Sequence, residues 1–142
     1  MAMSNSRMGT REYVAILKDL VDEGREVNMH VLGSSMAPFV VHECDVIYFK
    51  RPERKLRKGD IAFFQRKNGQ YVVHRIYKIK GNQYYFVGDN QTDIEGPIDK
   101  GQIFAAVTRV KRKGKMIGPG DFWWEFFARV WIRIIPVRAF LV

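Results

Sequence analysis

The stretch VLGSSMAPF, residues 31–39, places two serines between a glycine and a methionine. A serine hydroxyl attacks a carbonyl group only when a base takes its proton and hydrogen-bond donors stabilise the oxyanion. A Gly-Ser-Ser turn at the end of a strand would expose such a hydroxyl, although the same residues also make ordinary turns. Ser35 is therefore the candidate nucleophile, and its base must come from another part of the chain.

Three histidines are candidates for that base: His30, His42 and His74. His30 and His42 are close to Ser35 in sequence, but their surroundings are typical of a strand edge and a loop. His74 stands in the middle of the β-rich run QYVVHRIYKIK, where burial can tune the pKa of an imidazole. A single histidine on an apolar strand face is also often a core residue. His74 is the preferred base.

The position of His74 follows from a predicted hairpin. The Asn-Gly pair at 68–69 lies between two β-rich runs and is typical of a two-residue turn. Counting back from such a turn places Phe63 opposite His74. Because strand side chains alternate, His74 should share its face with Val72 and Ile76.

Hydrophobic periodicity predicts the elements that position these residues. Residues 10–23 repeat apolar side chains at helical spacing and form an amphipathic helix. The expected strands are 27–32, 45–50, 59–67, 70–80, 83–90 and 102–115, with a loop at 91–100. The tail, with Trp, Phe and Ile on most positions, predicts a C-terminal aromatic helix. The fold class is mostly β: an antiparallel, partly closed β fold with one helix at each end.

Length and composition limit the alternatives. The chain has 142 residues, 46% of them hydrophobic, which suits one domain. We expect a single domain over 10–118, with 1–9 disordered or tag-derived and 119–142 forming the amphipathic helix. One cysteine, Cys44, excludes an internal disulfide framework and leaves no cysteine pair for zinc. No apolar span long enough for a bilayer and no signal peptide are evident, so we expect a cytoplasmic protein.

Four sequence blocks occur in one order: GSSMAP, KGDIAFFQ, VVHRI and VGDNQTD. In this combination the chain resembles the signal peptidase I superfamily of serine peptidases, in the form that uses histidine in place of the usual lysine base. The same clan contains the self-cleaving repressor peptidases. The resemblance covers roughly residues 27–113. It implies that Ser35 is the nucleophile and that His74 is the general base and acid.

The resemblance leaves the third catalytic residue open. The Gly-Asp-Asn box offers Asp89, and a later acid orients the imidazole in histidine-type members. Asp93 is the nearest equivalent and Glu95 a second choice, while Asp89 would hold the loop. The oxyanion would be bound by the Ser35 N–H, with Ser34 standing near the position where some members use a serine hydroxyl.

The tail and the net charge of +9 suggest partners. An aromatic helix with few acids can lie in an anionic membrane interface, but residues 122–142 can equally pack on the core or against a second copy. The protein would then be peripheral at a membrane or a homodimer. Nucleic acid is not an expected partner, because no nucleic-acid-binding motif accompanies the basic runs.

These residues predict a serine endopeptidase that cleaves a peptide or leader-like substrate through a Ser35–His74 dyad and an acyl-enzyme, without metal or cofactor. The alternative from another class is a noncatalytic module that binds an extended peptide along a strand edge. A basic β-barrel that stacks nucleic acid bases on its aromatic residues ranks last, since most of those residues alternate into a core.

Overall fold

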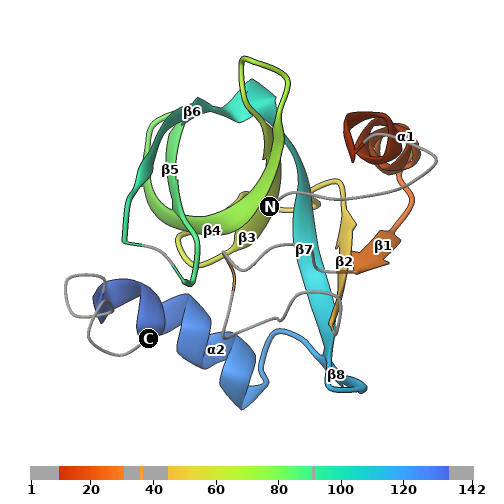
Figure 1. Ribbon diagram of the computed structural model, residues 1–142. Helices are drawn as coiled ribbons and strands as arrows, with labels where there is room; N and C mark the ends of the chain where they lie inside the picture. The colour runs from red at the N-terminus through yellow and green to blue at the C-terminus, as the bar shows by residue number, and fades with distance from the viewer. Residues whose placement is uncertain (1–9, 31–35, 37–44, 91, 135–142) are drawn as a thin grey trace.

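A long sheet and the helices packed on it are seen in the computed structural model, which describes residues 10–30, 36, 45–90 and 92–134 (Figure 1). The described residues form helix α1 (Thr10–Asp22) and eight strands. The strands are β1 (Val27–His30), β2 (Val46–Lys50), β3 (Ile61–Gln65), β4 (Tyr71–Lys80), β5 (Gln83–Val87), β6 (Glu95–Asp99), β7 (Ile103–Arg112) and β8 (Lys115–Ile117).

All the described strand pairs are antiparallel, in the order β1-β2-β7-β3-β4-β5-β6, and β8 adds to β7. Strands β3 to β6 curl round one end of the sheet, while β1, β2 and β7 extend toward α1 (Figure 1). The fold class expected from the sequence is confirmed: mostly antiparallel β, not closed, with an N-terminal and a C-terminal helix.

Helix α1 forms where the apolar periodicity predicts it. Val14, Leu17 and Val21 are buried at i, i+3 and i+7, so one face of the helix packs against the sheet. The helix ends at Gly24, which has a φ of 90° and whose N–H donates to Val21 O at 2.9 Å. A left-handed glycine just after the last turn satisfies a free helix carbonyl.

The β3–β4 hairpin differs from the prediction by one residue. Arg66 N–H donates to Gln70 O at 2.7 Å, and Gly69 has a φ of 92°, so the loop has three residues and ends in a left-handed glycine. This shift places Ala62, and not Phe63, opposite His74. The expected register was wrong because an Asn-Gly pair also suits a three-residue loop, which adds one residue to the turn.

Two strands were missed. Residues 95–99 fall in the expected loop but form β6, which pairs with β5. Strand β6 was not predicted because Gly96 and Pro97 are residues typical of turns. An edge strand tolerates proline, because the backbone on its outer side needs no N–H donor. The run expected as one strand over 102–115 turns back at Lys113 and Gly114 to give β8.

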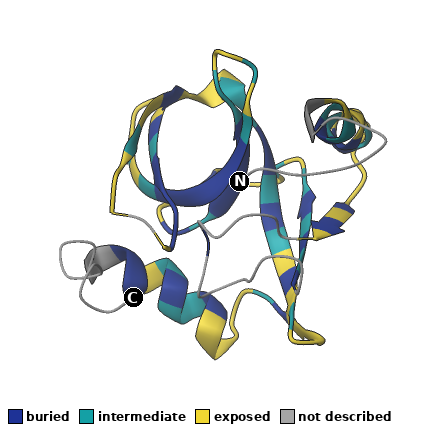
Figure 2. Ribbon diagram, viewed as in Figure 1, coloured by how far each residue is buried: buried dark blue, intermediate teal, exposed yellow. Residues whose placement is uncertain are grey.

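Strands β3 and β4 are buried along most of their length (Figure 2). Two hydrophobic cores lie on their opposite faces. The first core includes Phe63 and Val73 together with buried residues of both helices. The second core fills the curled part of the sheet and contains Phe64 and Val72. Its other members are Leu56, Ala62, Ile76, Tyr84, Phe86 and Ile98. Adjacent residues of β4 therefore contribute to different environments.

The C-terminal segment packs on the first core. Helix α2 (Phe122–Arg129) is followed by a 3-10 helix, η2 (Trp131–Ile134), so the regular helix is shorter than the expected 119–142. Trp124, Phe127 and Trp131 are buried in the core. No described helix is long and apolar enough to cross a bilayer.

Candidate active site

The predicted nucleophile, Ser35, lies outside the described residues, as do Ser34, His42 and Cys44. The residue that follows Ser35, Met36, is described and is 3% exposed. Met36 belongs to the first core, which also contains Val73, the residue before His74. Met36, which follows Ser35, and Val73, which precedes His74, therefore pack in the same hydrophobic core.

The predicted base, His74, is buried in β4 with 4% of its surface exposed. It shares a face with Val72 and Ile76 of the second core, as alternation predicts, and the small side chain of Ala62 stands opposite. Neither ring nitrogen has a hydrogen-bond partner among the described residues. Buried polar atoms are nearly always paired, so this imidazole is unusual.

Burial lowers the pKa of His74 from its ordinary value to about 4. Removing an imidazolium from water is unfavourable, which stabilises the neutral ring. The carboxylate of Glu95 acts in the opposite direction and raises this pKa, while the charge of Arg66 lowers it. At neutral pH the ring is therefore uncharged and has a nitrogen free to accept a proton.

Glu95 and Arg66 form a half-buried pair near His74. Arg66 Nε donates to Glu95 Oε2 and Arg66 Nη2 to Glu95 Oε1, both at 2.7 Å. This two-point geometry fixes the carboxylate, and the hydrogen bonds from Arg66 lower the pKa of Glu95. Among the predicted acids, Glu95 is the one whose charge contributes to the pKa of His74.

Asp89 makes a buried pair with Arg75. Arg75 Nε donates to Asp89 Oδ1 at 2.8 Å and Nη2 to Asp89 Oδ2 at 2.7 Å, and both side chains are almost completely buried. Arg75 Nη1 donates to Gly59 O at 2.9 Å, and the Trp131 indole N–H donates to Asp89 O at 2.7 Å. The Gly-Asp-Asn box is thereby joined to β4 and to the C-terminal segment.

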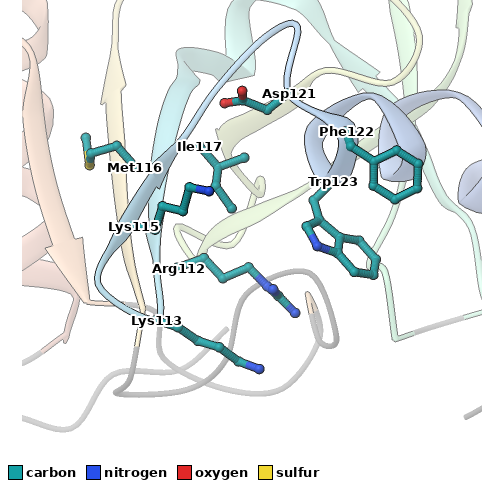
Figure 3. Close-up of a pocket in the computed structure, with 8 residues that line it drawn as sticks. All are labelled: Arg112, Lys113, Lys115, Met116, Ile117, Asp121, Phe122 and Trp123. Atoms are coloured by element: carbon teal, nitrogen blue, oxygen red, sulfur yellow. The ribbon is translucent and has the colours of Figure 1, made fainter.

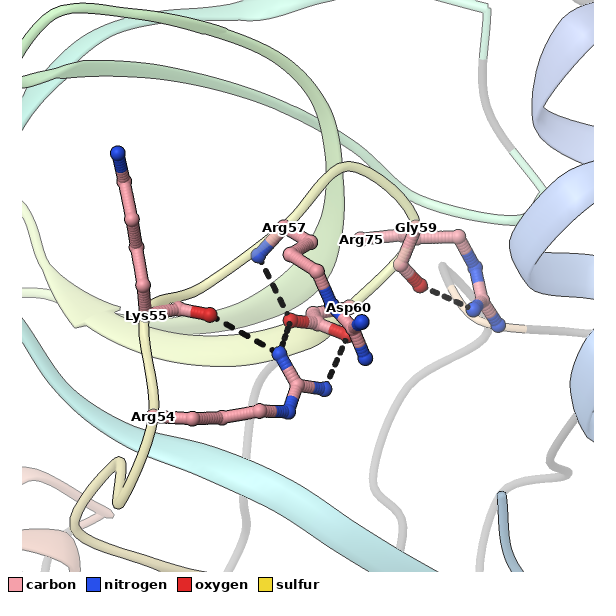
Figure 4. A network of polar contacts seen from close by, with 6 residues as sticks. All are labelled: Arg54, Lys55, Arg57, Gly59, Asp60 and Arg75. Atoms are coloured by element: carbon pink, nitrogen blue, oxygen red, sulfur yellow. Dashed lines mark hydrogen bonds and ion pairs between the residues drawn. The ribbon is translucent and has the colours of Figure 1, made fainter. Parts of the chain in front are cut away.

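The turn before β3 completes this network (Figure 4). Asp60 accepts hydrogen bonds from both Nη atoms of Arg54, at 3.0 and 3.1 Å, and from Arg57 N–H at 2.8 Å. Asp60 O accepts from Ile76 N–H, and Gly59 N–H donates to Ile76 O. The Lys-Gly-Asp block of the sequence thus has a structural role, in which it anchors the turn to β4.

Gly59 allows helix α2 to approach this turn closely. Its φ is +96°, and a Cβ atom built there would lie 2.5 Å from Ala128 O, which no side chain can occupy without displacing the helix. The KGD turn, Arg75, Asp89 and α2 therefore form one packed unit on the first-core face of β4.

The three predicted acids have different environments. Asp93 is exposed and makes no hydrogen bond or ion pair with another described residue, whereas both oxygens of Asp89 bind Arg75. None of the described contacts joins Asp89, Asp93 or Glu95 directly to His74. Sequence reasoning missed Arg75 and Arg66 as partners, although the arginine directly after His74, in the block VVHRI, was a usable signal.

Comparison with known proteins identifies the family of the chain. No match was found among curated proteins. The family model described as Peptidase S24-like matches residues 2–110, which covers α1, the whole sequence between Ser35 and His74, and most of β7. Helix α2 lies beyond the matched residues. The chain belongs to the Peptidase S24-like family, in the clan of serine peptidases that includes signal peptidase I.

Proposed function

We propose that this protein is a serine endopeptidase in which His74 activates Ser35. The observation that carries the proposal is the buried, neutral imidazole of His74, which has no hydrogen-bond partner among the described residues and lies inside the region that matches a serine peptidase family. An unpaired buried histidine lowers stability, because its ring nitrogens lose their hydrogen bonds to water. A role as general base accounts for its presence.

The reaction that this dyad would perform is acyl transfer. The neutral His74 ring takes the proton of Ser35 Oγ as that oxygen attacks the carbonyl carbon of a peptide bond. The imidazolium then gives the proton to the leaving amine, and the Ser35 acyl ester remains. A water molecule, deprotonated by the same ring, hydrolyses the ester and restores Ser35. The N–H of Ser35, with Ser34 nearby, is the proposed donor set for the oxyanion.

Carboxylates have separate roles in this proposal. Burial makes the imidazolium intermediate unfavourable, and the negative charge of Glu95 offsets part of that effect. Asp93 remains the acid favoured by the family resemblance for orienting the ring. Asp89 holds its loop through Arg75. The substrate class is an extended peptide segment, such as a leader peptide.

The experiment uses the full chain and a proteome-derived peptide library, with new termini identified by mass spectrometry. Wild-type protein should cleave a reproducible subset of peptides. Ser35→Ala and His74→Gln should each abolish cleavage, because losing one member of a coupled pair removes most of the rate. His30→Gln changes an exposed histidine on β1 and should leave the rate unchanged.

Each outcome of this experiment decides between the readings. Cleavage that persists in purified Ser35→Ala protein would overturn the nucleophile. Binding of library peptides without cleavage, equal in wild type and Ser35→Ala, would favour the noncatalytic peptide-binding module. Folding of each variant is checked by its thermal unfolding, so that loss of structure is not mistaken for loss of chemistry.

A further inference from the structure

Helix α2 has two apolar faces, and only one of them is buried against other described residues. Trp124 and Phe127, with Trp131 just beyond, form the inner face and are buried in the first core. On the outer face, Phe122 is 74% exposed and Val130 is 48% exposed. A soluble surface helix normally carries polar residues on its outer side, so this face requires an explanation.

The outer face is continued by aromatic residues in mutual contact. Phe122 stacks on Phe126, with 6.0 Å between the ring centroids, and Trp123 meets Phe126 edge-on at the same distance. Trp123 is 41% exposed, whereas Trp124 and Trp131 are each 8% exposed. The exposed aromatic surface is therefore a connected patch and not a set of isolated side chains.

The β7–β8 hairpin places positively charged side chains beside these exposed aromatic residues (Figure 3). Lys113 and Lys115 are exposed, and Met116, also exposed, lies next to them on β8. The guanidinium of Arg112 lies 5.1 Å from the centre of the Trp123 ring, which joins the hairpin to α2. We call this combined surface, formed by residues 112–117 and 121–123, the hairpin–helix patch.

Lys113 has a backbone conformation that lysine rarely adopts. Its φ is 51°, and Gly114 follows at 80°, so the two residues form a turn in which Asn or Gly is favoured at both positions. Lysine is unfavourable in this conformation. The turn is held by the Lys113 N–H, which donates to Asp45 Oδ1 at 3.1 Å, a bond that any residue except proline could make.

The single carboxylate among the residues lining the patch is already engaged. Asp121 Oδ2 accepts the N–H of Gly118 at 2.8 Å and caps the turn that leads into α2. Its negative charge is outnumbered by Arg112, Lys113 and Lys115. The patch therefore combines a positive potential with exposed Phe, Trp and Met side chains.

We propose that the hairpin–helix patch docks on an anionic lipid bilayer, with Phe122 and Trp123 at the headgroup level and Lys113 and Lys115 on the acidic headgroups. Tryptophan prefers this interface, and neighbouring lysines add attraction to acidic lipid. A symmetric dimer through the patch would bring the same cations face to face. Nucleic acid would also use the cations, and the test below distinguishes it from lipid. The proposal does not depend on peptidase activity.

The test mixes the full chain with vesicles of phosphatidylglycerol and phosphatidylcholine, or of phosphatidylcholine alone. The protein should sediment with the anionic vesicles only. Tryptophan emission should shift to the blue and be quenched by brominated lipid, and Trp123→Phe should abolish both signals because the other two indoles are buried.

Paired variants separate this surface from net charge. Lys113→Asn/Lys115→Gln should weaken partitioning roughly 30-fold, since each lysine near an anionic surface contributes about fivefold. Lys67→Asn/Lys80→Gln removes two exposed lysines from other parts of the surface and should change the partitioning onto vesicles much less. Lys113→Asn alone should unfold at the same or a higher temperature, which excludes a folding defect.

Four results would overturn the proposal. The two double variants could lose binding equally, which would indicate a general charge effect. Neutral vesicles could bind as well as anionic ones. A 20-base-pair DNA duplex could bind through Lys113 and Lys115 while vesicles give no lipid quenching, which would assign the patch to nucleic acid. Concentration-dependent dimerisation that is lost in Phe122→Ser, without vesicle binding, would assign it to a second copy.

Discussion

His74 and Arg75 are neighbours on β4, both are buried, and they have opposite environments. Arg75 points to the first-core face, where its guanidinium binds Asp89 and Gly59 O and lies 6.0 Å from the Phe127 ring. His74 points to the second-core face, where neither ring nitrogen is paired with a described residue. On one face of β4, therefore, Arg75 is hydrogen-bonded through its guanidinium. On the other face, the imidazole of His74 has no hydrogen-bond partner among the described residues.

This difference separates structural from chemical roles. A buried charge is tolerated when it is hydrogen-bonded to partners. Each of the three guanidinium nitrogens of Arg75 donates a hydrogen bond, and these bonds join β4 to the KGD turn and the Gly-Asp-Asn box. An unpaired buried imidazole is destabilising by about 1–3 kcal/mol. Proteins retain such groups mainly at functional sites. The rigid Arg75 face holds the strand from which His74 would act.

Removing the guanidinium should have the largest effect. Arg75→Met leaves the Asp89 carboxylate buried without its partner, so we expect the free energy of unfolding to fall by about 3–5 kcal/mol. Urea denaturation at pH 7 measures the change. Arg75→Met/Asp89→Leu removes both charges and should recover much of the loss. A double variant as unstable as the single one would show that the pair itself stabilises the fold.

The close approach of α2 can be tested with two glycines of similar backbone conformation. Gly59→Ala should destabilise the protein by about 2–4 kcal/mol, because a left-handed alanine is unfavourable and its Cβ would displace Ala128 O. Gly81→Ala has nothing within 4 Å of the new Cβ and should cost about 1 kcal/mol. Equal losses of unfolding free energy in the two variants would contradict the packing of α2 on this turn.

The pH dependence of stability should report His74. Its pKa falls from 6.5 in the unfolded chain to about 4 in the folded protein, so the unfolded state binds the extra proton between these values. The stability due to the neutral ring is complete above pH 6.5 and is lost as the pH falls toward 4. Between pH 7.5 and 4.5 we expect a loss of about 2–3 kcal/mol that His74→Leu does not show. Identical acid profiles for both proteins would contradict this.

The smallest expected effect concerns the Glu95–Arg66 pair. Arg66→Gln should raise the pKa of His74, because a positive charge that lowers it is removed, and Glu95→Gln should lower the same pKa. Both shifts should be below about one unit, since the pair is half exposed and screened by solvent. Nuclear magnetic resonance titration of the imidazole provides the measurement. Shifts of the same sign in both variants would disprove the electrostatic assignment.

Much of the fold was predictable because the strongest local patterns agree with the tertiary structure. Helix α1, the central strands β2 to β5 and the face of β4 that carries His74 all follow from apolar periodicity. The one-residue error in the β3–β4 register and the missed strand β6 arise from turn residues. Asn-Gly suits more than one loop length, and proline at a sheet edge looks like a loop.

The candidate site was predictable only where chemistry is local to the sequence. His74 could be singled out by its place in a long strand. Its lowered pKa depends on burial by residues far along the chain, which no local pattern encodes. The same is true of Arg75, whose partners come from the turn at 59 and the box at 89. Ser35, His74 and Asp93 remain predictions as catalytic residues.

The most direct test of the central claim is the titration of the His74 imidazole in the wild-type protein by nitrogen-15 nuclear magnetic resonance. His74→Gln identifies its signals. The structure predicts a neutral ring at pH 7 and a pKa of about 4, because the ring is buried. A ring that is charged at pH 7, or that titrates at 6.5 or above, would show that burial does not keep His74 neutral and would contradict the account.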